Sequence, residues 1–234
     1  MKARILNCLL IVGSAVALVA AESPGLSLDL LAQPLESARP YTWKHFSENS
    51  KTKLSDVWQL REGMLVCLGA PKGYLYLDHD FTNFILRLEW RWLEGKKPGN
   101  GGVLFRLTGP DKIWPRSLEA QLNTGEAGDF WGLDGFTLDG PAERKKTLDH
   151  AQFGKLTNLK RIADLEKPAG QWNQYEIIAR GPIVILRVNG QEANRATGCD
   201  VRAGKVCLTA EGDEIHFRNV TLQPLDQAGR LRPR

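Results

Sequence analysis

Three runs of alternating apolar and polar residues between Phe84 and Leu122 constrain the fold more than any other feature of the chain. They are FILRLEWRW, VLFR and LEAQL, and glycine- or proline-containing breaks separate them. Alternation with a period of two predicts strands with one buried face and one solvated face. If the three strands are neighbours, a single polar surface carries Arg87, Glu89, Arg106, Glu119 and Gln121.

Short strand patterns continue on both sides of this region. Runs at 56–60, 64–68 and 74–77 are separated by turn signals, and further runs follow Trp172. Asn189-Gly190 is the strongest short-range hairpin signal in the chain. No βαβ spacing, P-loop or GxGxxG motif occurs, so nucleotide chemistry is not supported. The pattern predicts an all-β protein, an antiparallel β-sandwich.

Residues 123–170 interrupt the strand pattern. This segment is rich in Gly, Asp and Lys and shows no clean period. We therefore expect a long loop insertion here, and loops of this length inside a compact domain are usually functional.

The two ends of the chain have their own character. Residues 1–21 combine a positive start, an apolar run and small residues before Glu22, which predicts a secretory signal peptide and a secreted or periplasmic protein. An uncleaved anchor is the alternative, but the run is short for a stable membrane span. We expect an irregular lead-in over 22–42, one domain over 43–226 and a basic tail over 227–234. The net charge of the whole chain is +4, and two of these positive charges lie in the predicted signal peptide. The charges of the remaining residues are therefore nearly balanced, which argues against a nucleic-acid partner.

Three cysteines lie outside the predicted signal. Cys199 and Cys207 flank a predicted turn, so they can pair as a hairpin disulfide in an oxidising compartment. No CxxC spacing is present and the chain has four histidines, which disfavours zinc. We expect no cofactor. Calcium at the Asp-Gly turns of Asp134 and Asp139 is the alternative, without EF-hand spacing to support it.

Several segments together resemble one family. They are NFILRLEWRW, NGGVLFR, LEAQL, KPAGQWNQYEIIARGPIVILRVNGQ and GDEIHFRNVTLQPL, and the similarity as a whole runs from about Trp58 to Leu225. In combination they are similar to the 3-keto-disaccharide hydrolase family. The resemblance implies a concanavalin A-like jelly roll that cleaves glycosides oxidised to a ketone at C3. One departure is Gly101, where many relatives carry Ser.

A C3 ketone acidifies the proton on C2, so cleavage needs a general base, a donor to the ketone oxygen and an acid for the leaving group. Glu119 is the candidate base or acid, Arg106 the candidate donor and Asp129 a second catalytic carboxylate. The candidate substrate-binding residues are Gln121, Trp131, Asn100 and His150.

Two other interpretations remain open at this point. Glu119, Gln121 and Arg106 can form an ordinary solvated strand face with a cross-strand ion pair. The same sandwich also hosts non-catalytic glycan-binding modules of the cell envelope. Whether the protein is an enzyme or a glycan-binding module, the expected partner is an oligosaccharide or glycoside.

Overall fold

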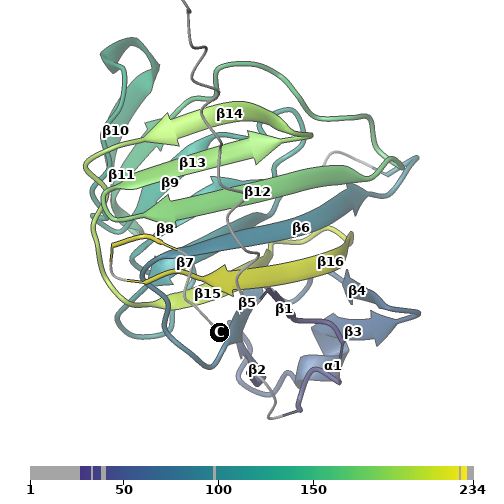
Figure 1. Cartoon of the computed structure of the whole chain (residues 1–234). Helices are drawn as coiled ribbons and strands as arrows, with labels where there is room; N and C mark the ends of the chain where they lie inside the picture. The colour runs from purple at the N-terminus through teal and green to yellow at the C-terminus, as the bar shows by residue number, and fades with distance from the viewer. Residues whose placement is uncertain (1–26, 33, 38–40, 97–98, 227, 231–234) are drawn as a thin grey trace, which may run out of the picture.

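The computed structural model describes residues 27–32, 34–37, 41–96, 99–226 and 228–230. Two eight-stranded antiparallel sheets pack face to face as a sandwich (Figure 1). The all-β sandwich prediction is confirmed. The predicted signal peptide and most of the predicted tail lie outside the described residues.

Sheet A lies in front in Figure 1. Its strands, in spatial order, are β14 (Gln191–Ala196), β13 (Ile183–Val188), β12 (Asn173–Arg180), β6 (Phe84–Trp92), β16 (Ile215–Pro224), β4 (Met64–Cys67) and β3 (Trp58–Arg61), with β1 (Leu28–Asp29) beside β16. A single helical turn, α1 (Leu54–Val57), precedes β3 where the sequence suggested an earlier strand start.

Sheet B lies behind sheet A. Its strands, in spatial order, are β10 (Lys145–His150), β11 (Gly154–Leu159), β9 (Phe130–Leu133), β8 (Ser117–Gln121), β7 (Gly102–Leu107), β15 (Lys205–Ala210), β5 (Gly73–Leu77) and β2 (Trp43–Ser47). The segment predicted as a loop insertion therefore contains β9, a short 3-10 helix η1 (Ala142–Arg144), β10 and β11. It shows no period because β9 has four residues and β10 is exposed along almost its whole length.

The alternating residues behave as predicted within each strand. The apolar positions of β6, β7 and β8 meet in one core between the sheets, where Leu86, Trp90 and Phe105 are at most 1% exposed. Burial of side chains of this size contributes about 1.5–3 kcal/mol each. The Asn189-Gly190 hairpin also forms, joining β13 to β14, and both turn residues have positive φ (50° and 81°) as a type I′ turn requires.

The prediction that β6 is a neighbour of β7 and β8 is wrong. β6 is the central strand of sheet A, between β12 and β16, whereas β7 and β8 belong to sheet B. Because both apolar faces point into the shared core, the two polar faces point to opposite sides of the molecule. Arg87 and Glu89 lie on the outer face of sheet A, where they pair with Glu176 and Arg218.

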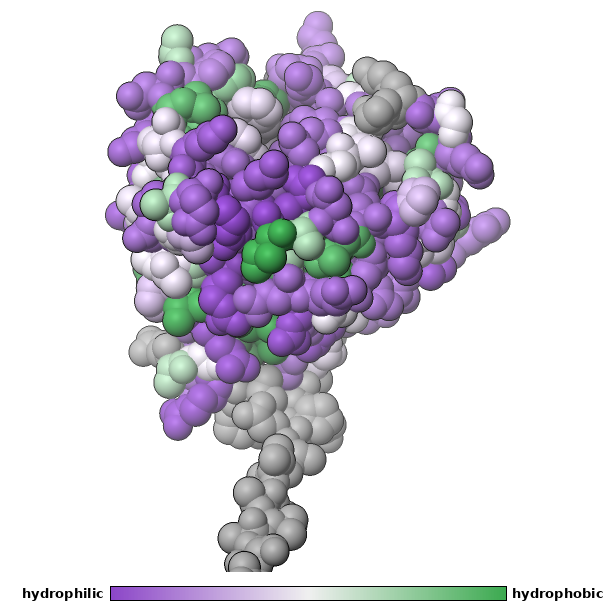
Figure 2. Space-filling view, turned by 90° about the horizontal axis from the view of Figure 1, so that it is seen from above, coloured by the Kyte–Doolittle hydropathy of each residue, from purple (hydrophilic) through white to green (hydrophobic). Residues whose placement is uncertain are grey.

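The surface seen in Figure 2 is mostly hydrophilic, with apolar residues gathered in small separate patches. The helices of the described segments are too short to span a bilayer.

Candidate functional site

The outer face of sheet B carries the best candidate site. Its outward side chains form a second apolar cluster, separate from the main core, which includes Tyr74, Leu104 and Cys207. The loop 108–116 and the turn of the β10–β11 hairpin cover part of this face. Trp114 from the loop and Phe153 from the hairpin meet there, with ring centroids 4.3 Å apart.

Beneath these two rings lies a hollow of about 150 Å³, which we call the Glu211 hollow. Its walls include Lys72, Tyr74, Leu104, Trp114, Phe153, Thr209 and Glu211. Aromatic and apolar walls with a few converging polar groups are typical of small-molecule sites.

Glu119 projects onto this face from β8, where its register partners are Leu104 on β7 and Trp131 on β9. The side chain is 4% exposed. Its Oε1 lies 2.0 Å from the place where a Cβ at position 102 would stand, so the carboxyl group occupies the space that Gly102 leaves open. Burial raises the pKa of Glu119 well above its usual value, and the negative charge of Glu211 raises it further.

Glu211 follows the last residue of β15 and faces the hollow. Its Oε2 accepts a hydrogen bond of 2.7 Å from Nδ2 of Asn100. Burial raises the pKa of Glu211, while Thr209, the charge of Lys72 and Trp114 act in the opposite direction. Within the described part of the chain, Oε1 of Glu211 and Oδ1 of Asn100 are buried without a hydrogen-bond partner. Unpaired buried acceptors are costly, and Glu211 lines the hollow, so its Oε1 is a candidate acceptor for a donor group of a ligand.

The two carboxyl groups have different surroundings. Glu119 is the more enclosed, and no neighbouring donor lowers its pKa. Glu211 has a cation and several polar groups beside it. Two carboxyl groups whose environments separate their pKa values are arranged for acid and base roles. Burial raises the pKa of both groups, but only that of Glu211 is partly lowered again by its neighbours, so Glu119 is the better proton donor and Glu211 the more readily ionised of the two.

Three of the predicted residues meet at this face. Glu119 contacts Gly102, whose N–H donates to Thr209 Oγ1 (2.6 Å), and Asn100 donates to Glu211. Trp131 is half-buried beside Glu119 in the outer cluster.

Gln121 lies on the same strand as Glu119, but its side chain is used locally. Its Oε1 accepts the backbone N–H groups of Leu122 and Asn123, both at 3.0 Å. It therefore stabilises the turn after β8, and its acceptor is not directed at the hollow.

The prediction that Arg106 assists Glu119 is wrong. Arg106 has φ +52° at an irregularity in the pairing of β7 with β15, and this bulge turns its side chain away from the outer face. The side chain is fully buried, and its guanidinium donates to the backbone carbonyls of Thr82, Asp200 and Gly181 at 2.7–3.0 Å. It joins strand ends of the two sheets.

Asp129, the predicted second catalytic carboxylate, is engaged in a buried ion pair with Arg161. Asp129 is 6% exposed, and its Oδ1 accepts from the backbone N–H and the Nη1 of Arg161 at 2.9 and 3.1 Å. This buried pair fixes the chain after β11.

His150 is exposed at the end of β10, where its ring stacks on Phe153 at 4.6 Å and its Nδ1 accepts backbone N–H groups. It supports a covering ring and does not line the hollow.

The predicted disulfide is absent, because Cys199 and Cys207 are both free and buried. Cys199 packs in the core between the sheets, whereas Cys207 packs in the cluster on the outer face of sheet B.

The two carboxylates considered for calcium binding each pair with a lysine, Asp134 with Lys112 and Asp139 with Lys145. No group of three metal-ligating side chains occurs among the described residues.

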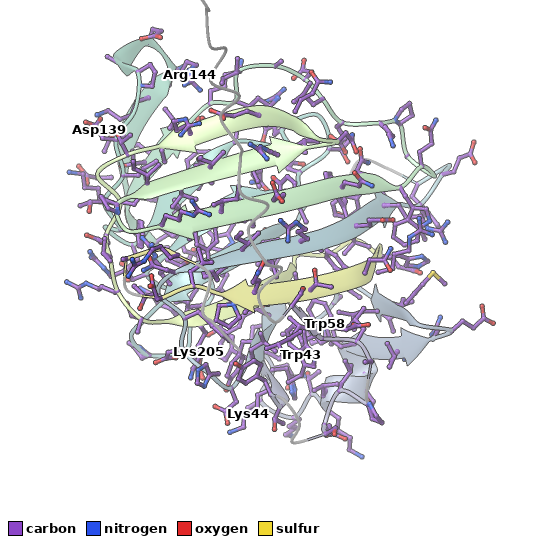
Figure 3. The ribbon with its side chains drawn as sticks, in the orientation of Figure 1. Trp43, Lys44, Trp58, Asp139, Arg144 and Lys205 are labelled. Carbon is purple, nitrogen blue, oxygen red and sulfur yellow. The ribbon has the colours of Figure 1, made fainter. Side chains whose placement is uncertain are left out.

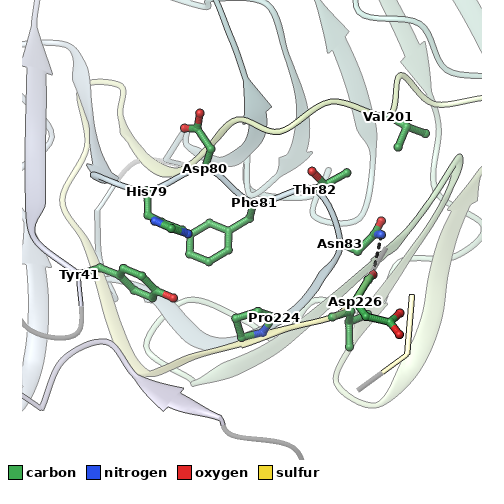
Figure 4. A pocket seen from close by; sticks show the side chains of 10 residues that line it. Tyr41, His79, Asp80, Phe81, Thr82, Asn83, Val201, Pro224 and Asp226 are labelled. Atoms are coloured by element: carbon green, nitrogen blue, oxygen red, sulfur yellow. Dashed lines mark hydrogen bonds between the residues drawn. The ribbon is translucent and has the colours of Figure 1, made fainter. Parts of the chain in front are cut away.

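A larger hollow of about 410 Å³ lies at the far end of the sandwich, lined by Tyr41, His79, Asp226 and others (Figure 4). Its carboxylate Asp226 is held ionised, since hydrogen bonds from Arg230 lower its pKa. This hollow has no counterpart of the Glu119–Glu211 pair and is a weaker candidate for acid–base chemistry.

Sequence reasoning missed Glu211, Lys72 and Trp114. Glu211 was assigned to a turn, although the alternation of β15 continues through Cys207 and Thr209 to this residue. No local pattern marks Lys72 or Trp114, because each reaches the site from a connecting segment.

Comparisons with solved structures agree with the β-sandwich fold. A glycosyl hydrolase candidate from Parabacteroides distasonis shares 19% identity at a TM-score of 0.54, covering 79% of this chain and 88% of that one. A carbohydrate-binding module from Bacillus subtilis has 12% identity and a TM-score of 0.52, covering 77% and 94%. A β-glucanase from Bacillus licheniformis has 12% identity and a TM-score of 0.51, covering 86% and 98%.

At these identities the solved structures establish a shared fold. A search of curated proteins found no match. The sequence profile of the 3-keto-alpha-glucoside-1,2-lyase-like domain matches residues 39–223, most of the chain. The chain therefore belongs to the 3-keto-alpha-glucoside-1,2-lyase-like domain family.

Proposed function

We propose that this protein cleaves glycosides whose sugar ring carries a ketone at C3, by elimination across C1–C2 followed by addition of water. The observation that carries the proposal is the buried pair of Glu119 and Glu211 on the outer face of sheet B, where Glu211 lines an apolar hollow and is the more readily ionised of the two. The family assignment supports the substrate class.

In the proposed reaction the Glu211 carboxylate removes the C2 proton, which the neighbouring ketone acidifies. The electron pair forms the C1–C2 double bond as the bond from C1 to the glycosidic oxygen breaks. The Glu119 carboxyl group donates its proton to that oxygen, and the alcohol leaves. Water then adds at C1 while a proton returns to C2, so both carboxyl groups regain their starting states.

Lys72 is suited to a third role. Its ammonium group lies at the exposed rim of the hollow, on the side of Glu211. A cation near the C3 oxygen would stabilise the negative charge that develops there as the proton leaves C2. Arg106, the donor expected from sequence, is unavailable because its three donor groups are used by backbone carbonyls.

The direct test uses the purified protein and methyl 3-keto-α-glucoside in deuterated water. The proposal predicts release of methanol and a sugar product that carries deuterium at C2. Release of methanol without deuterium at C2 would contradict the elimination route. Binding of the glycoside without release would instead support the alternative function, a glycan-binding module.

We also propose that the protein acts outside the cytoplasm, in the periplasm or as a secreted protein. The signal-like pattern of residues 1–21 supports this location. Fractionation of cells that express the full chain tests it, and retention of uncleaved protein in the cytoplasm would contradict it.

A further inference from the structure

Trp114 covers the Glu211 hollow in an unusual backbone conformation. Its φ is +54°, in the left-handed region, although the residue is neither glycine nor asparagine. A bulky residue in this region is strained, and such strain persists only where the surrounding structure fixes the residue. Strained residues of this kind gather at binding and catalytic sites. The strain therefore singles out Trp114 among the residues that line the hollow.

The loop 108–116, which carries Trp114, is fastened to the sandwich at three points. Its anchors are the contacts Tyr74–Asp111 (2.5 Å), Lys112–Asp134 (2.7 Å) and Arg116–Asp200. Two anchors precede Trp114 along the chain and one follows it. The indole is therefore a fixed part of the cover.

The other part of the cover is the β10–β11 hairpin, which carries Phe153 at its turn. The hairpin stands at the upper left of Figure 3, beside Asp139 and Arg144. Among the described strands β10 pairs only with β11, and its side chains are exposed along almost its whole length. A hairpin with so few buried contacts opens more readily than the strands of the core. Phe153 is therefore the movable partner of Trp114, and the two ring centroids lie 4.3 Å apart.

The size of the hollow calls for such an opening. A cavity of about 150 Å³ holds a molecule the size of benzene, and a hexose has about twice as many non-hydrogen atoms. A sugar ring would thus fit only when Phe153 moves away from Trp114. The two rings would then border the bound sugar and offer apolar surface to its C–H groups.

Trp114 also interacts with Glu211. Burial raises the pKa of Glu211, and the indole N–H of Trp114, together with Thr209 and Lys72, lowers it again in part. Asn100 donates to Oε2 of the same carboxyl group at 2.7 Å. Donors on a carboxylate hold it in one orientation and favour its charged form.

We propose that Trp114 is a positioning residue, which holds the Glu211 carboxylate in place for the C2 proton and closes with Phe153 over the sugar ring. The proposal rests on the proposed function, which makes Glu211 the base. Trp114 takes no part in proton transfer, so its loss should weaken catalysis without abolishing it.

The first test is independent of catalysis. Carbon-13 NMR of protein labelled at the glutamate carboxyl carbons follows the titration of Glu211, whose signal is assigned with Glu211→Gln. Trp114→Phe keeps a ring against Phe153 and removes the indole N–H. The Glu211 midpoint should rise by about 0.5–1 pH unit in this variant, the effect of one lost hydrogen bond.

Two further variants complete this test. Trp114→His restores a ring N–H and should give a lower Glu211 midpoint than Trp114→Phe. The matched control is Trp172→Phe, since Trp172 packs against Arg91 and Arg218 of sheet A and should leave the midpoint unchanged. A Glu211 midpoint that is the same in Trp114→Phe as in the wild type would overturn the proposal.

The second test records the pH dependence of kcat/KM for methyl 3-keto-α-glucoside. Trp114→Phe should move the low-pH limb of the profile upward by about 0.5–1 unit, because Glu211 must be ionised to accept the C2 proton. Phe153→Ala should leave this limb in place and raise KM by about two- to tenfold, the effect of one lost ring contact.

An unmoved limb in Trp114→Phe, or an unchanged KM in Phe153→Ala, would overturn the proposed closure and positioning. If the wild type does not turn over the glycoside, the proposed function fails. The NMR titration then still decides whether Trp114 holds Glu211.

Discussion

Glu119 is an acidic side chain almost sealed from solvent, whereas carboxylates such as Asp78 and Glu176 pair with cations at the surface. Its raised pKa has a consequence for stability. Above a pH of about 4.5, the unfolded chain releases the Glu119 proton while the folded protein retains it. The unfolded state then binds fewer protons, so the free energy of unfolding falls as pH rises from the unfolded pKa toward the folded one.

Replacing Glu119 by Gln removes this penalty and keeps the shape of the side chain. We expect Glu119→Gln to match the wild type near pH 4.5 and to exceed its thermal midpoint at pH 8. Each pKa unit corresponds to about 1.4 kcal/mol, and each kcal/mol to about 2–4 °C in a domain of this size. Thermal unfolding at several pH values measures the difference.

The matched control is Glu176→Gln, which changes a carboxylate on the outer face of sheet A that pairs with Arg87 and Arg187. This control should show no gain at pH 8. A stability difference for Glu119→Gln that did not grow with pH would contradict the account of its burial.

Two adjacent glycines, Gly101 just before β7 and Gly102 at its first residue, differ in how closely they approach Glu119. An added Cβ at Gly102 would stand 2.0 Å from Glu119 Oε1, whereas at Gly101 the nearest atom is 3.5 Å away. Gly102→Ala should displace Glu119, lower the free energy of unfolding by about 1–3 kcal/mol, and reduce turnover of methyl 3-keto-α-glucoside. Chemical denaturation and initial rates measure the two effects.

The control is Gly101→Ser, a substitution at the neighbouring glycine. Its Cβ would make ordinary contacts with Trp92 and Thr209, so stability should change by about 0.5 kcal/mol or less. Equal effects of the two substitutions would mean that Gly102 does not shape the position of Glu119.

The bulge in β7 gives Arg106 a structural role that can be measured. Arg106→Met leaves three partly buried carbonyl groups without their donor, and we expect a loss of about 3 kcal/mol or more in the free energy of unfolding. Urea denaturation measures it. Arg87→Met, which breaks exposed pairing on sheet A, should cost about 1 kcal/mol or less. Similar losses for both variants would contradict the role assigned to Arg106.

Individual strands were largely predictable, because a buried face imposes a period of two on the sequence. The same period correctly oriented Glu119 outward and Trp90 inward. It failed at Arg106, because a bulge there reverses the direction of the side chain. The backbone of Arg106 is in the left-handed region, but the residue is not a glycine that would signal this in the sequence. It also failed for β10, which has no buried face to impose a pattern.

The sandwich as a whole separates two polar surfaces that look alike in sequence. Alternation specifies which residues of a strand share a face, but it does not specify which strands are neighbours. Arg87 and Glu89 therefore share a polar face with Glu119 in the prediction from sequence, but in the structure they lie on the outer face of the other sheet. Glu211 is about 90 residues from Glu119 along the chain. It lies on the same face as Glu119 only because β15 pairs with β7.

The central claim is that Glu119 and Glu211, on the outer face of sheet B, perform the chemistry. The most direct measurement is the turnover of methyl 3-keto-α-glucoside by Glu119→Gln and Glu211→Gln at pH 7, with folding checked by thermal unfolding. The account predicts that each variant stays folded and loses at least about a hundredfold in kcat, the usual contribution of an acid or base. Turnover within a few-fold of the wild type in either folded variant would contradict it.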